Sequence, residues 1–219
     1  MTGIDAMTEI EYEPDHTKHS VGGSYGHWFR RVIHLSIALI AWIYYEYGQQ
    51  VADILHLDNA TQFAALVGLI YAAVEAFRLK YGITVVGQRE YEAHQVSALF
   101  WGVMSVVITM IVLEPHHPQG VAHGWLGYPL IASLAFGDPA LGEMRRARMQ
   151  AKHVAAGGTA VVFAVWICCW YLVGTPLWLC FIMPPLTVAA EWPKLKWIDD
   201  NATMLLIPLA ATILLLPFL

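Results

Sequence analysis

Charged residues are scarce in this chain of 219 residues. Only 13% of them are Asp, Glu, Lys or Arg, and 58% are hydrophobic. A soluble domain is typically about 25% charged and about 45–50% apolar. The shortage of charge excludes an ordinary soluble domain, and the recurring apolar runs predict an integral membrane protein.

Metal-binding and disulfide patterns are also missing. The three cysteines, Cys168, Cys169 and Cys180, lie inside apolar runs without Cys-x-x-Cys spacing, and no His-Glu-x-x-His pattern occurs among the ten histidines. We therefore expect small buried thiols and no zinc site. No cleavable signal peptide is recognisable, because the first 27 residues are polar and partly acidic.

Seven apolar blocks follow one another along the chain. They cover approximately residues 28–47, 60–77, 97–113, 121–136, 154–173, 176–190 and 203–219. Some are short for a hydrocarbon core of about 30 Å, so tilted or partial spans are expected. The predicted fold is all-α, a polytopic transmembrane bundle of about seven helices. Residues 1–26 are expected to form a flexible cytoplasmic tail, and residues 27–219 a single transmembrane domain.

The positions of the charges predict the topology. If the helices alternate from a cytoplasmic N-terminus, all twelve Lys and Arg residues fall on the cytoplasmic side, where such residues are enriched. The opposite side then carries only the acids Glu46, Asp53, Asp58 and Glu114. Several other acids also fall at cytoplasmic helix ends, among them Glu75 and Glu191 at the edges of apolar blocks. Ionisable groups at such places tend to face a polar cavity or a partner.

The polar stretch 137–159 combines an acid, four cations and a glycine pair. Asp138 follows an apolar block and is predicted to end a helix; Lys152 precedes a predicted turn formed by Gly157, Gly158 and Thr159. An acid for a divalent metal, cations for phosphates and glycines for close backbone approach suit a nucleotide-binding loop. Alternatively, its arginines anchor the chain at anionic lipid head groups.

Three short pairs of charged or polar residues add to this pattern. Glu75 and Arg78 are three residues apart, as are Arg31 and His34, and Arg89 and Glu92 come just before the third block. Each pair also has a purely structural interpretation. Glu75 and Arg78 could form a local ion pair, His34 could be a packed histidine, and Glu92 could interact favourably with a helix N-terminus. In the functional reading the arginines contact phosphates, Glu75 and His34 support them, and Glu92 is a metal ligand or a base.

A second acidic stretch comes immediately before the last block. Glu191 leads to Asp199, Asp200 and Asn201. Asp200 or Asn201 could cap the last helix. Alternatively, Asp200 and Asn201 face the same side as Asp138 and complete a magnesium–triphosphate site with it. Mg²⁺ prefers oxygen ligands and bridges phosphate oxygens.

These motifs, in this order, resemble those of the CTP-dependent lipid-alcohol kinases, which include dolichol kinase, phytol kinase and the CTP-using diacylglycerol kinase. These enzymes are related in pattern to the membrane CDP-lipid cytidylyltransferases. The resemblance spans about residues 28–208. Its motifs are Arg31-x-x-His34, Glu75-x-x-Arg78, Arg89-x-x-Glu92, Gly137-Asp138-Pro139-Ala140 with Gly142, Lys152 before Gly158-Thr159, and Glu191 leading to Asp199-Asp200-Asn201 and Pro208.

The resemblance implies phosphoryl transfer from CTP, with Mg²⁺, to the hydroxyl of a long isoprenoid alcohol in the bilayer. Asp138 and Asp200 would hold the metal, Lys152 would contact the phosphates, and Asn201 would complete the site. The base would be Glu92, Asp138 or Asp200. The chain departs from the family at 153 and 157, where His153 stands for the usual serine and Gly157 for the usual acid.

Two other functions stay open at this point. A cytidylyltransferase would attack CTP at the α-phosphate and release pyrophosphate instead of CDP. A small transporter would more often place charged groups near the middle of the bilayer. The acceptor could also be of the diacylglycerol type. No nucleic-acid partner is expected, and the sequence leaves the oligomeric state open.

Overall fold

The computed structural model describes residues 21–113, 120–193, 195 and 197–219, and these form an all-helical bundle without strands. The seven long helices are α1 (Gly23–Ile54), α2 (Ala60–Tyr81), α3 (Ala98–Leu113), α4 (Gly127–Arg146), α5 (Ala151–Val173), α6 (Leu179–Glu191) and α7 (Asp200–Leu215). The short 3-10 helices are η1 (Glu90–His94), η2 (Val121–Gly124) and η3 (Leu216–Phe218). The predicted number of helices and the all-α class are confirmed for the described residues.

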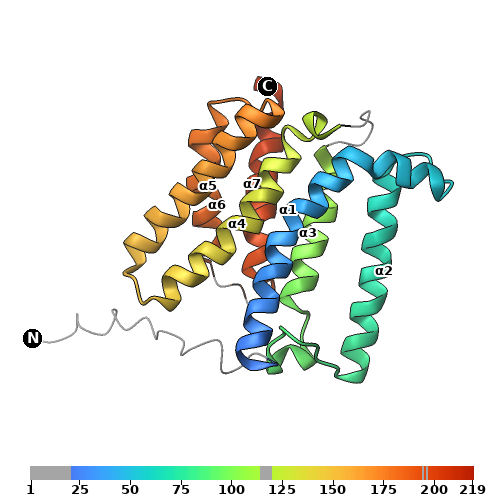
Figure 1. The fold of residues 1–219 in the computed structure, drawn as a ribbon, viewed down its shortest axis with the longest axis vertical. Helices are drawn as coiled ribbons and strands as arrows, with labels where there is room; N and C mark the ends of the chain where they lie inside the picture. The colour runs from blue at the N-terminus through green and yellow to red at the C-terminus, as the bar shows by residue number, and fades with distance from the viewer. Residues whose placement is uncertain (1–20, 114–119, 194, 196) are drawn as a thin grey trace, which may run out of the picture.

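Successive helices run in opposite directions through the bundle (Figure 1). As a result, the start of α1, the end of α2, the α4–α5 connection and the start of α7 lie at one end. We call this the polar end. The C-terminus and η2 lie at the other end. The helix α2 stands at the edge of the bundle and packs on α1 and α3, whereas α4 is central and contacts α1, α3, α5, α6 and α7.

The described lysines and arginines all belong to segments at the polar end. They are Arg30, Arg31, Arg78, Lys80, Arg89, Arg145, Arg146, Arg148 and Lys152. The acids Glu46 and Asp53 belong to the last part of α1, and Asp58 belongs to the α1–α2 connection at the other end. The remaining residues on which the topology prediction depended, Lys18, Glu114, Lys194 and Lys196, lie outside the described residues. The separation of charge follows from the alternation of the helices.

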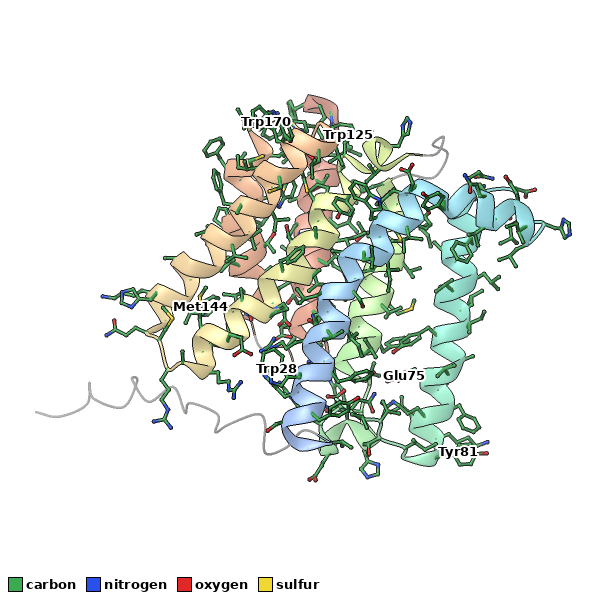
Figure 2. The ribbon with its side chains drawn as sticks, viewed as in Figure 1. Trp28, Glu75, Tyr81, Trp125, Met144 and Trp170 are labelled. Carbon is green, nitrogen blue, oxygen red and sulfur yellow. The ribbon has the colours of Figure 1, made fainter. Side chains whose placement is uncertain are left out.

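Three of the described helices are long and apolar enough to cross a membrane: Ala60–Tyr81, Ala151–Val173 and Asp200–Phe218. Two more apolar helices, α3 and α6, are shorter. Aromatic side chains lie toward both ends of the bundle, with Trp125 and Trp170 near the C-terminal end and Tyr81 at the polar end (Figure 2). Such a distribution is typical of the two interfaces of a membrane.

Two predicted boundaries were wrong. The helix α1 begins at Gly23 and ends at Ile54, so it includes the last residues of the predicted tail and continues beyond Gly48. The helix α4 continues to Arg146, with Pro139 inside it, although the sequence predicted a helix end at Asp138. Proline lacks an N–H and so removes one helical hydrogen bond, but apolar helices tolerate this when their neighbours cover the gap. Asp138 therefore projects from the body of a helix.

The predicted glycine turn was also wrong. Gly157, Gly158 and Thr159 lie inside α5, where the two glycines allow close packing against α4. A methyl group on Gly157 would be 2.7 Å from the sulfur of Met144, and one on Gly158 would be 2.9 Å from Cγ of Leu141. Their small size serves the contact between α4 and α5, as in other membrane helix pairs.

Candidate functional site

The side chain of Asp138 faces the first third of α1. Its Oδ2 atom lies 3.3 Å from Nδ1 of His34 and 3.8 Å from Nη1 of Arg31. The carboxylate also interacts electrostatically with Arg30 and Arg145. Asp138 is 16% exposed, and His34 is 5% exposed. A partly accessible carboxylate thus lies among three arginines and a histidine.

The position of Arg31 depends on a glycine in α4. The guanidinium lies over Gly142, where a methyl group would be 3.0 Å from Nη1 of Arg31. The Nε atom of Arg31 donates to Glu143 at 3.1 Å, and Nε2 of His27 lies 3.1 Å from the same carboxylate oxygen. A side chain at 142 would push Arg31 away from Asp138. The contact gives the small size of residue 142 a structural reason.

A second arginine, Arg145, is fixed by the end of α6. Both of its terminal nitrogens donate to the carboxylate of Glu191, with Nη2–Oε2 at 2.6 Å. The guanidinium also lies 5.3 Å from the ring centre of Trp192. Glu191 is almost fully buried, whereas the Arg145 side chain is 38% exposed. The planar group is held in place on one side and keeps an accessible surface for an anion.

The start of α7 supplies the remaining acids. The Asp199 side chain accepts a hydrogen bond from the backbone N–H of Asn201 at 3.1 Å and caps the helix. The amide of Asn201 donates to the carbonyl of Ala98 at 3.3 Å, and its buried Oδ1 has no hydrogen-bond partner among the described residues. Because Asp199 caps α7, Asp200 is not the cap of this helix.

Asp199 has an unusual protonation equilibrium. Burial of its carboxyl group and the adjacent charge of Asp200 raise the pKa of Asp199 to about 7. Burial is the larger cause, because it removes water from the charged form. Near neutral pH, Asp199 is therefore a mixture of the protonated and ionised forms.

The structure brings Asp138 and Asp200 to the same region of the polar end. Both interact electrostatically with His34, Arg145 and Glu191. The contributing helices are α1, α4, α6 and α7, which are far apart in sequence. We call Arg30, Arg31, His34, Asp138, Arg145, Glu191, Asp199 and Asp200 the Asp138 cluster.

A different role emerges for Glu75 and Arg78. All five N–H groups of Arg78 donate hydrogen bonds: two to Glu75 at 2.8 Å, and three to the carbonyls of Ile83, Glu92 and Gln95. Glu75 also accepts from the backbone N–H of Ser97 at 2.7 Å. The predicted contact of Arg78 with a phosphate was wrong, because the guanidinium has no N–H left to donate. The pair instead fixes the segment between α2 and α3.

Glu92 and Arg89 belong to that same segment. The Glu92 carboxylate is 3% exposed and accepts from the backbone N–H groups of Arg89 at 3.0 Å and Ala98 at 3.2 Å. Glu92 also lies 3.6 Å from Arg30. These contacts give Glu92 the capping role, and Arg30 connects this segment to the Asp138 cluster.

Lys152 is not brought into the cluster. It is exposed in the first turn of α5 and is not among the groups that interact with Asp138 in the described chain. Its predicted phosphate contact was tied to the glycine turn, which the structure replaces with a helix.

Two residues of the cluster were missed as site residues. Arg30 is four residues before His34, so the two share a face of α1. Arg145 is seven residues after Asp138, which is two turns along α4. The first spacing was visible in the sequence. The second had meaning only if the helix continued through Pro139.

The oxygen donors at the polar end suit Mg²⁺ only together with a phosphate ligand. Among the described residues, no group of three His, Cys, Asp or Glu side chains is placed to hold a metal. Asp138, Asp200 and the unpartnered Oδ1 of Asn201 are nevertheless oxygen donors of the kind Mg²⁺ prefers. Mg²⁺ usually takes only one or two protein carboxylates together with waters and substrate phosphates. The donors fit a shared protein–phosphate site and not an all-protein cage.

Comparison with known protein families, curated proteins and solved structures finds no match. The described part of the chain is an all-helical bundle with three helices long and apolar enough to cross a membrane and a charged cluster at one end. Any more specific function depends on the motifs and on the geometry of the Asp138 cluster.

Proposed function

We propose that this protein is a CTP-dependent kinase that phosphorylates the hydroxyl of a long-chain isoprenoid alcohol of the dolichol or polyprenol type. Mg²⁺ takes part, and the Asp138 cluster faces the cytoplasm in a multi-pass membrane protein. The observation that carries the proposal is the convergence of Asp138 and Asp200 beside Arg31 and Arg145. The ordered motifs shared with the lipid-alcohol kinases supply the substrate class.

The arrangement suits phosphoryl transfer, which requires positioning and charge neutralisation more than covalent chemistry. Arg31 and Arg145 are each held by a glutamate, and the 38% exposure of the Arg145 side chain leaves it a surface for phosphate oxygens. Bound Mg²⁺ supplies further neutralisation of the phosphate charge, and Asp138, Asp200 and Asn201 would hold it. An anionic nucleotide approaching from water would meet the cationic end of the bundle first.

The reaction balances without another reactant. The alcohol oxygen forms a bond to the γ-phosphorus of CTP, the bond from that phosphorus to the bridging oxygen breaks, and CDP leaves. The hydroxyl proton passes to a carboxylate or to water. Asp138 and Asp200 suit the role of acceptor better than Glu92, because two backbone N–H groups already occupy the Glu92 carboxylate.

The direct test is incubation of the purified protein with CTP, Mg²⁺ and a panel of isoprenoid alcohols. The expected products are a polyprenyl phosphate and CDP in equal amounts. Pyrophosphate with a CDP-lipid would assign the site to a cytidylyltransferase. Solute uptake into vesicles, with no turnover of CTP by any lipid alcohol, would favour a transporter.

A further inference from the structure

A cleft at the polar end lies between α1 and the segment that follows α2. Its empty space is about 440 Å³, a figure that includes the open solvent at its mouth. Its walls are mainly apolar and are formed by Phe29, Ile33, Val85, Val86 and Leu99. We call it the α1 cleft.

The inner side of the α1 cleft is polar. Arg30, His34 and Glu92 contribute to its lining. His34 is the residue whose Nδ1 lies 3.3 Å from Asp138, and Arg30 interacts electrostatically with both Asp138 and Asp199. The cleft is thus continuous with the Asp138 cluster through two residues that belong to both.

The outer wall of the cleft is held firmly although it is a loop. The backbone N–H of Val21 donates to the carbonyl of Gln88 at 2.8 Å, and Gly87 donates back to Val21 at 3.1 Å. Gly87 has φ +90°, and a methyl group there would be 3.4 Å from the Phe29 ring. The glycine therefore allows the loop to approach α1 closely. A fixed wall favours a permanent binding site over a gap that opens by chance.

The exposed lining of the cleft, on both α1 and the loop, is apolar. Phe29 is 40% exposed, Val86 42% and Val85 47%, in a segment next to the cationic end of the bundle. Exposed apolar side chains beside a charged site suit a ligand with an apolar chain and a polar head. The head would point toward Arg30 and His34, and the chain would leave past Val86.

We infer that the α1 cleft binds the acceptor alcohol, with the hydroxyl end of the isoprenoid chain next to His34 and Arg30 and the following apolar units against Phe29, Ile33 and Val86. This inference rests on the proposed function and adds to it the place where the lipid enters. The nucleotide and the lipid then approach the Asp138 cluster from different sides.

The test begins with Val86→Trp, which fills the mouth of the cleft at a residue that does not belong to the Asp138 cluster. Its matched control is Leu69→Trp on α2, at a position that is 70% exposed. We expect Val86→Trp to raise the KM for the alcohol at least about tenfold and to leave the KM for CTP unchanged. The control should change neither constant. An unchanged KM for the alcohol in Val86→Trp would overturn the inference.

A second measurement does not require kinase activity. An isoprenoid alcohol that carries a photoreactive diazirine is crosslinked to the full-length protein in detergent without nucleotide, and the labelled peptides are mapped. We expect labelling of the peptides around Phe29–Ile33 and Val85–Val86, competition by unlabelled alcohol, and loss of labelling in Val86→Trp. Labelling elsewhere, or equal competition by a phospholipid, would overturn the inference.

The two measurements also separate this inference from the proposed function. If the cleft is labelled specifically in a protein that turns over no CTP, the alcohol-binding site is supported and the kinase function is contradicted. Turnover of CTP by the alcohol without specific labelling of the cleft would retain the kinase and reject this site.

Discussion

The polar end of the bundle holds two charged clusters whose hydrogen-bonding capacity is used very differently. In the cluster around Arg78, every guanidinium N–H and the carboxylates of Glu75 and Glu92 have partners within the protein. In the Asp138 cluster, Asp138 and Arg145 remain partly accessible. A saturated network stabilises a fold, whereas an unsaturated one keeps capacity for a ligand.

The largest expected effect is on turnover, at the centre of the unsaturated cluster. Asp138→Asn should lower kcat about a thousandfold, because an amide neither carries the charge nor binds Mg²⁺ as a carboxylate does. The measurement is CDP release at saturating CTP, with the helical circular dichroism signal as a check of folding. Asp53→Asn at the opposite end of the bundle is the control and should keep full activity. An active Asp138→Asn variant with unchanged magnesium dependence would remove the basis of the proposed function.

The saturated cluster should respond in stability. Arg78→Met leaves buried Glu75 without its partner and should lower the free energy of unfolding by about 3–5 kcal/mol. The measurement is thermal unfolding in detergent. Lys80→Met is the control, because Lys80 is exposed near the same end of α2, and it should change stability little. A stable Arg78→Met variant that is defective only in its KM for CTP would return Arg78 to the phosphate-binding role.

A smaller effect is expected at Gly142, where the site depends on packing. Gly142→Ala should displace Arg31 from Asp138 and lower kcat/KM for CTP about tenfold with the fold retained. The matched control is Ala140→Ser, a change of similar size two residues earlier in α4. If Gly142→Ala has normal kinetics, the position of Arg31 over the glycine is not important for the reaction.

The smallest effect concerns pH. Because the pKa of Asp199 is raised to about 7 in the folded protein, from about 3.9 in an unfolded chain, the folded state binds the proton more tightly. Stability from this group is present at pH 4 and is lost as the pH rises through 7. Asn is also a good cap, so Asp199→Asn should be more stable than the parent at pH 8 by about 1–2 kcal/mol, a reduced figure because Asp199 is partly exposed. The gain should disappear near pH 4. Equal gains at both pH values would contradict the raised pKa.

The sequence predicted the features that depend on composition and order along the chain. The seven apolar blocks and the gathering of the described cations at one end were visible because hydrophobic length and charge position are one-dimensional signals. The sequence also predicted that Asp138 and Asp200 lie at the same end of the bundle, because alternating helices bring both there.

The errors came from residues whose local preference was overruled by their surroundings. Pro139 and Gly157 normally favour turns, but in an apolar bundle one is tolerated within α4 and the other makes room for Met144. Similarly, the spacing of Glu75 and Arg78 showed that they pair. It did not show that three distant carbonyls would use up the other N–H groups of Arg78.

The glycine pair of α5 has one more consequence. Replacing Gly157 or Gly158 with alanine is a common way to strengthen an isolated helix, and it would be expected to add about 1 kcal/mol there. In this protein the added methyl group would clash with Met144 or Leu141 of α4. The helix α4, which carries Asp138 and Arg145, would shift as a result. Substitutions meant to stabilise the helix would therefore disturb the Asp138 cluster, and in the proposed kinase they would lower turnover.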